Sequence, residues 1–322
     1  MSDNTRHLIN VALLVAIVTY VVIMILENTP LFPVQASAEG LPVDWLFGLH
    51  LRVIAFLFAL IVVFVLYSVI AFRRKPGETG DGDYFHGNTT LEIFWTILPL
   101  ATVLYFSYLG AVTLADITSP AKDEMVVNVT ASQWKWRFEY PDSGVTTSEL
   151  ALPLGRTVHL QLESSDVIHD FWVPEFRVKQ DAVPGMVKSL RVTPTRVGEY
   201  KVRCAEICGS GHADMRAPVK VMPADEFDAW LSAKEEELAL LEAGPAIERG
   251  KHVAELMGCQ ECHSLDGSPG KAPTWKGLYG KEETLADGTT VTVDEAYIHE
   301  SIVTPGAKIV KGFGNSMPPR FG

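Results

Sequence analysis

The residues of this chain that could do redox or metal chemistry gather in two short stretches. The first, residues 202–215, reads VRCAEICGSGHADM and contains two of the four cysteines. The second, residues 259–263, reads CQECH and contains the other two. Thiolates and imidazoles bind soft and borderline metals, so each stretch is a candidate site for a metal or a redox cofactor.

In the first stretch Cys204, Cys208 and His212 follow one another at intervals of four residues, and Met215 comes three residues later. His169, in SSDVIHDFWVP, is the best candidate for a further imidazole. A disulfide would suit an exported domain. A structural zinc site would leave the methionine without a role, and a single blue-copper site needs only one cysteine. The residue types favour two coppers bridged by sulfur, while zinc and a disulfide stay open.

The second stretch is the Cys-x-x-Cys-His signature of covalent haem c attachment. Cys259 and Cys262 would form the thioethers, and His263 would be the proximal iron ligand. A thioredoxin-like pair would need a surrounding βαβ pattern, and a zinc site would need two more ligands. The distal ligand should be a methionine or histidine from far along the chain, and Met317 in GFGNSMPPRFG is the strongest candidate. His–Met ligation would raise the reduction potential relative to two histidines.

Three apolar runs predict membrane-spanning helices at about 8–26, 46–72 and 94–114, each near the roughly 20 residues that a span needs. The first run could be a signal peptide ending at Ala36-Ser37-Ala38, but its length favours a retained span. Arg73 and Arg74 follow the second run and are expected to stay cytoplasmic. Everything after the third span then lies outside, so the protein is predicted to be multi-pass.

The rest of the chain divides by composition. Residues 1–118 form the anchor, and residues 119–223 alternate as strands do, at 125–140, 156–165, 189–204 and 217–222, which predicts a small all-β sandwich or barrel. Residues 224–243 predict a solvated helical linker, ended by Gly244-Pro245. Residues 244–322 predict helices at 246–258 and 292–303. The net charge of −12 argues against a nucleic-acid partner.

Five motifs, in order along residues 45–222, resemble subunit II of haem–copper oxidases: LEIFWTILP, SQWKWRFEYP, SSDVIHDFWVP, KQDAVPGM and CAEICGSGHADM. The resemblance implies a cupredoxin-like Greek-key domain with a binuclear copper A centre. It implies that His169 and His212 each ligate one copper, that the two cysteines bridge both, and that Met215 is a weak ligand. Glu206 would offer its carbonyl to copper and its carboxylate to magnesium or manganese beside subunit I.

The resemblance also gives roles to two residues that have simpler explanations. Trp134 would lie near the point of electron entry, although Trp134 and Trp136 should share one strand face and either could be a packing residue. Glu92 would lie at the cytoplasmic mouth of a proton channel completed by subunit I. The spacing of Thr89 and Glu92 also fits a capping box at the start of a helix.

The C-terminal motifs APTWKGLYG and DEAYIHESIVTPGAKIVKGFGNSMP resemble class I cytochrome c domains, including those fused to subunit II. The Pro273 carbonyl would then accept a hydrogen bond from the proximal histidine. We therefore expect a multidomain protein with transmembrane helices, an all-β cupredoxin-like domain and an all-α cytochrome c domain.

The expected function is that of subunit II of a cytochrome-c-fused cytochrome c oxidase in a bacterial inner membrane, with its C-terminal domains in the periplasm. Electrons would pass from an external donor (a cytochrome, a cupredoxin or a quinol-oxidising complex) to haem c, copper A and subunit I, which reduces dioxygen and pumps protons. Subunit III is a further expected partner, and no catalytic residue is expected in this chain. The alternatives are a copper A subunit of a nitric oxide reductase and a stand-alone membrane-anchored electron shuttle.

Overall fold

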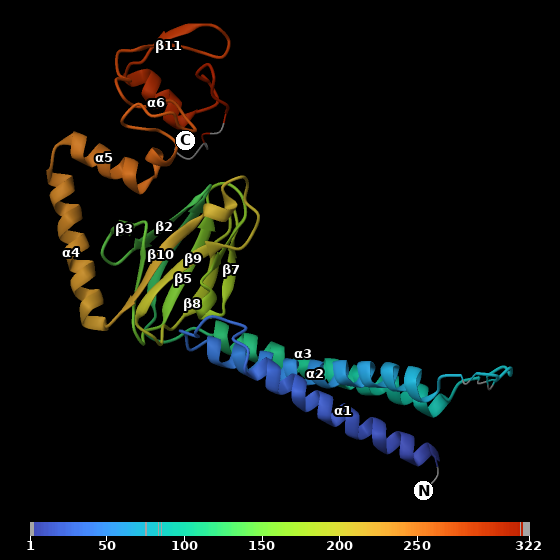
Figure 1. Ribbon diagram of the computed structural model, residues 1–322. Helices are drawn as coiled ribbons and strands as arrows, with labels where there is room; N and C mark the ends of the chain where they lie inside the picture. Colours follow the sequence, from blue (N-terminus) through green and yellow to red (C-terminus); the bar gives the residue numbers. More distant parts are fainter. Residues whose placement is uncertain (1–2, 75, 83, 85, 316, 318–322) are drawn as a thin grey trace. The chain divides into compact units, whose positions relative to one another are not determined.

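The computed structural model describes residues 3–74, 76–82, 84, 86–315 and 317. The chain separates into two compact units, Met1–Ser119 and Pro120–Gly322. The elements of the first unit are long helices, and the second unit contains a β-sandwich followed by a smaller domain of short helices and loops (Figure 1).

The first unit consists of α1 (Asp3–Glu27), α2 (Gly40–Ala71) and α3 (Thr89–Thr118). All three are long and apolar enough to cross a membrane. A helix suits this environment because it satisfies its backbone hydrogen bonds within the segment. Helices α1 and α3 contain the predicted spans 8–26 and 94–114, and α2 covers the predicted span 46–72 except for its last residue.

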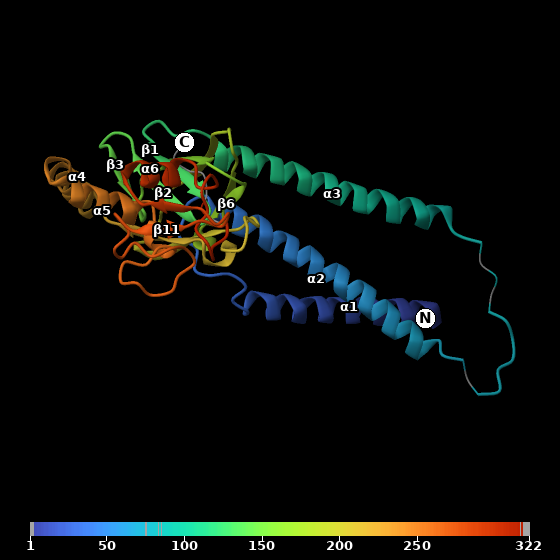
Figure 2. The same cartoon turned by 90° about the horizontal axis from the view of Figure 1, so that it is seen from above.

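Helix α1 packs along α2 (Figure 2). The middle of the contact is a small apolar cluster made by Val11, Val15, Ala59 and Val63. Near one end of the pair, the His7 Nδ1 atom lies 2.7 Å from the Tyr67 hydroxyl. Near the other end, Arg52 Nη2 donates to Glu27 Oε1 at 3.0 Å. Polar contacts therefore hold α1 to α2 at both ends of an apolar interface.

Helix α3 begins one residue earlier than the proposed capping box requires. The Asn88 side chain accepts a hydrogen bond from the Leu91 backbone N–H at 3.1 Å, and Thr89 is already helical. The prediction of a Thr89–Glu92 capping box is therefore wrong. Asparagine is at least as good an N-cap as threonine, and it comes first in the chain.

The second unit begins with two five-stranded sheets packed face to face. The order is β3-β2-β1-β5-β8 in one sheet and β4-β10-β9-β6-β7 in the other. The pairs β1–β5 and β4–β10 are parallel, and the other pairs are antiparallel. The strands are β1 (Met125–Ser132), β2 (Lys135–Tyr140), β3 (Val145–Thr147), β4 (Leu150–Pro153), β5 (Val158–Ser164), β6 (His169–Trp172), β7 (Lys179–Ala182), β8 (Lys188–Val192), β9 (Gly198–Cys204) and β10 (Arg216–Met222). Short 3₁₀ turns occur at η1 (Pro174–Phe176) and η2 (His212–Asp214).

The all-β prediction for this region is confirmed, but it contains more strands than the sequence indicated. Alternate residues of β1 and β5 are buried, as expected where one face of a sheet covers a core. The predicted strand 125–140 is a hairpin with a turn at Gln133-Trp134, and the predicted strand 189–204 is β8 followed by β9. Strands β3, β4, β6 and β7 were not predicted, because runs of three or four residues give almost no periodic signal.

The next helix, α4 (Ala224–Ala243), packs on the sandwich through its first turns. Phe227 is only 2% exposed, and it stacks with Trp230. Both rings contact Tyr140, at centroid distances of 6.2 and 5.5 Å. The Tyr140 hydroxyl in turn donates to the Ala151 carbonyl and accepts from its N–H, and burial raises the pKa of this phenol. Aromatic packing therefore anchors a helix that was predicted to be fully solvated.

The C-terminal domain contains α5 (Ala246–Leu256), η3 (Cys259–Glu261) and α6 (Glu295–Val303). Gly258, with φ of +68°, ends the first helix in the left-handed conformation that favours glycine. The Asp294 carboxylate caps α6 by accepting from the Tyr297 N–H at 2.8 Å. A hairpin of β11 (Glu282–Thr284) and β12 (Thr290–Thr292) adds strands to a domain that was predicted to be all-α.

The ion pair between Glu124 and Arg191 makes stability depend on pH. Arg191 donates to the Glu124 carboxylate at 2.7 and 3.0 Å, and this bond lowers the pKa of Glu124. The ion pair therefore contributes its full stability above the unfolded-state pKa of Glu124, near 4.3. This stability is lost as the pH falls through the lower pKa that Glu124 has in the folded state. Glu124→Gln should lower the unfolding free energy of the sandwich by about 1 kcal/mol at neutral pH.

This loss should shrink as the pH is lowered toward about 3, where the native carboxylate is increasingly protonated. Thermal unfolding of the purified chain in detergent across that range measures it. Glu199→Gln, the same change at an exposed position of β9, should leave the stability almost unchanged. A loss for Glu124→Gln that is independent of pH would contradict this assignment.

Candidate functional site

The pairing of β6 with β9 builds the first candidate site. Strand β6 starts at His169, strand β9 ends at Cys204, and their antiparallel register places Phe171 opposite Cys204. The loop that follows β9 is fixed at both ends, because the Cys204 N–H donates to the Met215 carbonyl and the Ala205 N–H donates to the Asp170 carbonyl. Two segments about 35 residues apart in the chain are thereby held side by side.

The predicted ligand atoms converge inside this loop. The two cysteine Sγ atoms are 3.6 Å apart. Cys204 Sγ lies 3.8 Å from His169 Nδ1, and Cys208 Sγ lies 3.6 Å from His212 Nδ1. Met215 Sδ is 3.8 Å from Cys208 Sγ. Each sulfur of the pair therefore faces its own imidazole, and the thioether lies beside one of them.

The geometry bears on how many metal ions such a donor set could hold. His169, Cys204 and Cys208 form a group whose ligand atoms all lie within 4.8 Å of one another, and His212 is not in that group. One tetrahedral zinc ion would require all four donors around a single centre. Two thiols, two imidazoles on different sulfurs and a buried thioether instead suit a pair of soft metal ions. Glu206 places its carbonyl 3.2 Å from Cys204 Sγ, and its side chain is exposed.

The electrostatics of this site differ between the two thiols. Burial opposes ionisation of Cys204, but hydrogen bonds with His169 and nearby backbone groups outweigh it and lower the pKa of this thiol. Burial and the neighbouring sulfur raise the pKa of Cys208. Burial alone would lower the pKa of His169, but hydrogen bonds with Asp166 and Cys204 outweigh burial and raise it. A metal ion that binds here therefore displaces protons from its ligands.

Asp166 is a residue of this site that the sequence analysis missed. Its carboxylate accepts hydrogen bonds from His169 Nε2 at 2.8 Å, the Gln133 N–H at 2.6 Å and the Val167 N–H at 2.7 Å. The imidazole is thereby oriented with Nδ1 toward the thiols. The only sequence signal was an acid three residues before a candidate ligand, and carboxylates commonly orient ligand histidines in this way.

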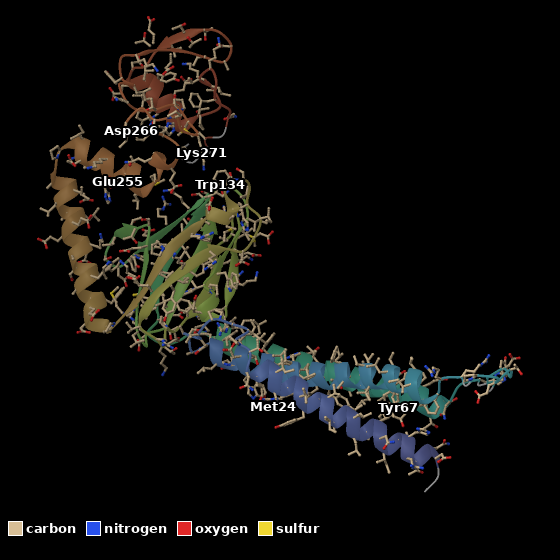
Figure 3. All side chains as sticks on the ribbon, viewed as in Figure 1. Met24, Tyr67, Trp134, Glu255, Asp266 and Lys271 are labelled. Atoms are coloured by element: carbon tan, nitrogen blue, oxygen red, sulfur yellow. The ribbon has the colours of Figure 1, made fainter. Side chains whose placement is uncertain are left out.

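Trp134 lies in the turn between β1 and β2, at one end of the sandwich (Figure 3). Its ring covers the ligand loop, where Trp134 Nε1 and Gln133 Nε2 donate to the Cys208 carbonyl at 3.2 and 2.7 Å. Trp136 is instead in the core, with its ring 5.6 Å from Phe171. The prediction that the two tryptophans share a strand face is wrong, because β2 begins only at Lys135.

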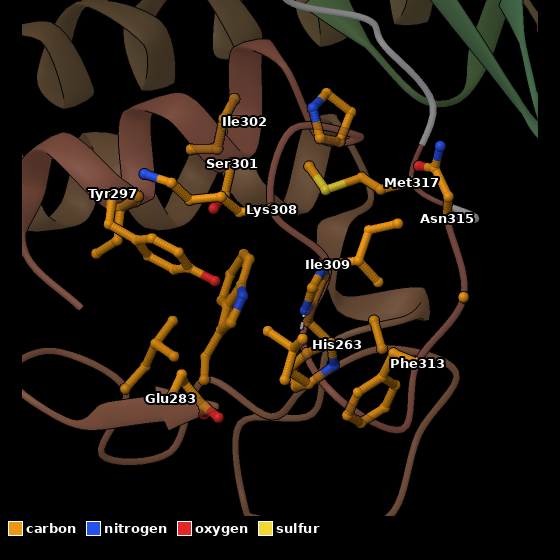
Figure 4. Close-up of a pocket in the computed structure, with 18 of the residues that line it drawn as sticks. His263, Glu283, Tyr297, Ser301, Ile302, Lys308, Ile309, Phe313, Asn315 and Met317 are labelled. Carbon is orange, nitrogen blue, oxygen red and sulfur yellow. Dashed lines mark hydrogen bonds between the residues drawn. The ribbon is translucent and has the colours of Figure 1, made fainter. Parts of the chain in front are cut away.

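The second candidate site is a cavity of about 340 Å³ in the C-terminal domain (Figure 4). Both predicted iron ligands, His263 and Met317, line it. His263 Nδ1 lies 2.7 Å from the Pro273 carbonyl, so the predicted hydrogen bond is present and Nε2 is left for a metal. Cys259 and Cys262 lie just before the histidine, and no disulfide joins them. The largely apolar wall, the ligand pair and the adjacent thiols fit a covalently attached porphyrin.

Glu92 occupies the first turn of α3, and its side chain is exposed. None of the described residues of α3 is buried within the first unit. Exposed apolar residues on a membrane span are ordinary when lipid or another subunit covers them. Among the described residues, no other predicted functional side chain bonds to Glu92.

Comparison with known proteins identifies the family. Residues 27–109 match the model of the cytochrome c oxidase subunit II transmembrane domain, and residues 145–222 match that of its periplasmic domain. Cytochrome c oxidase subunit 2 of Thermostichus vulcanus is 32% identical over 293 residues, which cover 74% of this chain and 89% of that protein. The corresponding protein of Alkalihalophilus pseudofirmus is 31% identical over 261 residues, covering 77% and 75%.

The periplasmic domain of subunit II of the Bradyrhizobium japonicum cytochrome oxidase is 26% identical, covering 37% of this chain and 98% of that one, with a TM-score of 0.35. The chain belongs to the cytochrome c oxidase subunit II family. It is a membrane-anchored subunit of an oxidase, with its C-terminal part on the periplasmic side. Neither family match extends beyond Met222, so the domain that contains the CQECH motif lies outside them.

Gly211 is required for the close approach of Trp134 to the ligand loop. A Cβ at this position would come within 2.4 Å of the Trp134 ring. Gly211→Ala should displace the ring and destabilise the sandwich by about 1–3 kcal/mol, the usual cost of overpacking. Thermal unfolding of the purified chain measures the loss.

The matched control is Gly250→Ala in α5, where nothing lies within 4 Å of an added Cβ. An alanine in the middle of a helix is about 1 kcal/mol better than a glycine, so this variant should be neutral or slightly stabilised. Equal effects of the two substitutions would mean that the tryptophan does not pack on the loop as described.

Proposed function

We propose that this chain is the electron-entry subunit of a cytochrome-c-fused cytochrome c oxidase. Residues 1–118 would anchor it, residues 119–223 would hold binuclear copper A, residues 224–243 would link the domains, and residues 244–322 would hold haem c. Electrons from an external donor would pass through the haem and the copper centre to subunit I, where dioxygen is reduced and protons are pumped. Copper A and haem c supply the one-electron redox chemistry that the side chains of this chain lack.

The observation that carries this proposal is the convergence of five ligand side chains at the loop between β9 and β10, residues 205–215, called the copper loop below. His169, Cys204, Cys208, His212 and Met215 would hold the two copper ions, with the Glu206 carbonyl as a further donor. Four contacts of 3.6–3.8 Å, each made by Cys204 or Cys208, link all five side chains. His169 and both thiols are buried and hydrogen-bonded in the fold even without a bound metal ion. Such preorganisation limits the rearrangement that accompanies a change of oxidation state.

The residues around the copper loop would control access to it. Gln133 and Trp134 both bond to the Cys208 carbonyl, and the indole covers one surface of the loop. The tryptophan is therefore the side chain best placed to meet an incoming electron donor at this loop. On the loop itself, Ile207 is 78% exposed, which suits a surface that another subunit covers.

The C-terminal cavity supports the haem c part of the proposal. Cys259 and Cys262 would each add their S–H across a vinyl group, which needs no oxidant. His263 and Met317 would hold the iron, and Pro273 would orient the histidine through its carbonyl. The covalent attachment would keep the cofactor on the domain during electron transfer.

The remaining assignments concern the partner subunits. We assign to subunit I the membrane-facing surface of α3 that includes Glu92, which would lie at the cytoplasmic mouth of its proton channel. The exposed Glu206 carboxylate would bind magnesium or manganese at the same interface. Subunit III is a further expected partner. Copper, iron and manganese analysis of the purified complex tests the whole set. The expected result is two coppers and one haem iron per copy of this chain, in addition to the copper and haem iron that subunit I contains.

Replacing Cys204 by serine separates the two cofactor sites. The substitution removes one of the two thiols that would hold the copper ions, so the near-infrared absorption of the copper centre should disappear. The haem c spectrum should persist, because the second site shares no ligand with the first. Absorption spectroscopy and copper-to-iron ratios of the variant complex measure both. Zinc in place of copper in the unmodified protein would contradict the proposal.

Replacing Met317 by alanine tests the distal haem ligand. The haem should stay attached through its thioethers but lose its sixth ligand, so the reduced variant should bind carbon monoxide. Difference spectra of the unmodified and variant complexes measure this. Met186→Ala, at an exposed methionine of the sandwich, should leave the spectrum unchanged. If the Met317 variant does not gain carbon monoxide binding at haem c, another residue is the ligand.

A further inference from the structure

Glu283 is a buried acid of the C-terminal domain to which the proposed function gives no role. The residue is only 8% exposed, whereas its neighbours Glu282 and Thr284 on β11 are exposed. Side chains of a strand alternate between its two faces, so Glu283 points inward and Glu282 outward. Carboxylates are rarely buried to this extent without a reason, because leaving water is costly for a charge.

The inward face of β11 meets the cavity that His263 and Met317 line. Glu283 is part of the cavity wall, together with apolar residues such as Ile309 and Phe313 (Figure 4). Among the described residues that line this cavity, it is the one carboxylic acid. A negative charge at this place therefore lies in the low-dielectric surroundings that a bound porphyrin would share.

The positive partner of Glu283 lies on the outside. Lys281 Nζ is 2.5 Å from Glu283 Oε1, but the lysine side chain is 50% exposed. Water and salt screen an exposed ammonium group far more than a buried carboxylate. The pair therefore satisfies the acid and still leaves a net negative field inside the cavity.

The other charged groups near the cavity do not cancel this field. Lys308 lines the wall, but its amine is 2.5 Å from Glu300 Oε2, so that cation is already paired. Lys271 also lines the wall, and it is exposed to water. The field at the cavity thus follows mainly from Glu283.

We propose that Glu283 sets the reduction potential of the haem c site by holding it down, an inference that rests on the proposed function. Oxidised haem carries one more positive charge than reduced haem. A nearby buried carboxylate stabilises the more positive state and so disfavours reduction. Burial, dielectric and local charge are among the levers by which a protein adjusts a haem potential.

The test compares Glu283→Gln with Glu282→Gln in the complete purified complex. Both remove one negative charge from the same strand, and only the first changes the face that lines the cavity. Glu283→Gln should favour haem c reduction by about tenfold, which is about 59 mV for a one-electron couple. Glu282→Gln should give a much smaller shift. Spectroelectrochemical titration of the haem c band measures both.

A third variant should shift the haem c reduction potential in the opposite direction. Lys281→Met removes the screened cation and leaves the carboxylate, so the haem c potential should fall. Because this lysine is half exposed, its replacement should disturb the domain little. The Lys281 variant therefore still tests the inference if the Glu283 variant fails to incorporate haem. A purely structural role for the acid would change haem content or thermal stability but would not produce shifts of opposite sign.

The outcomes separate this inference from the proposed function. Equal shifts for the Glu282 and Glu283 variants, or no fall in potential for Lys281→Met, would overturn the inference while haem c itself remained. A pyridine haemochrome assay that finds no covalently bound haem in the unmodified chain would overturn the proposed function, and the role of Glu283 would fall with it.

Discussion

The antiparallel contact between β6 and β9 is the interaction on which the ligand loop that follows β9 depends. It places a histidine at the start of one strand beside a cysteine at the end of the other. Both strands lie inside a five-stranded sheet, so shifting either of them would break the pairing with its other neighbour. The short ligand loop then needs only a few backbone bonds to bring the second cysteine, histidine and methionine to the same place. Rigidity at the ligands is thus a property of the sheet more than of the loop.

The two candidate sites hold their ligand side chains in place in different ways. The sandwich gathers its donors from one loop and one distant strand, and a large core holds both in place. The C-terminal domain has a much smaller core, formed around Leu285, Val293 and Tyr297, and much of its interior is the cavity itself. A domain this small gains stability from whatever fills its interior, since ligand binding to the folded state alone shifts the folding equilibrium.

The ligand-bearing motifs were predictable from the sequence because their chemistry depends on residue type and short spacing. His169, Cys204, Cys208 and His212 could be chosen from thiol and imidazole chemistry, and the structure brings them together. The supporting residues could not be chosen in this way. Asp166 and Gln133 matter through contacts made between distant segments of the chain, which no local pattern records. The position of Trp134 was mistaken for the same reason, since a two-residue turn inside an apolar run leaves the alternation almost unbroken.

The anchoring of α4 alters what covalent fusion achieves. Phe227 and Trp230 fasten the first turns of this helix to Tyr140, so the 20-residue segment is a rigid arm about 30 Å long. A flexible chain of the same length would let the attached domain explore a spherical volume. The arm removes most of that volume. The C-terminal domain also contacts the sandwich directly, because Lys135 Nζ lies 3.0 Å from Glu261 Oε1.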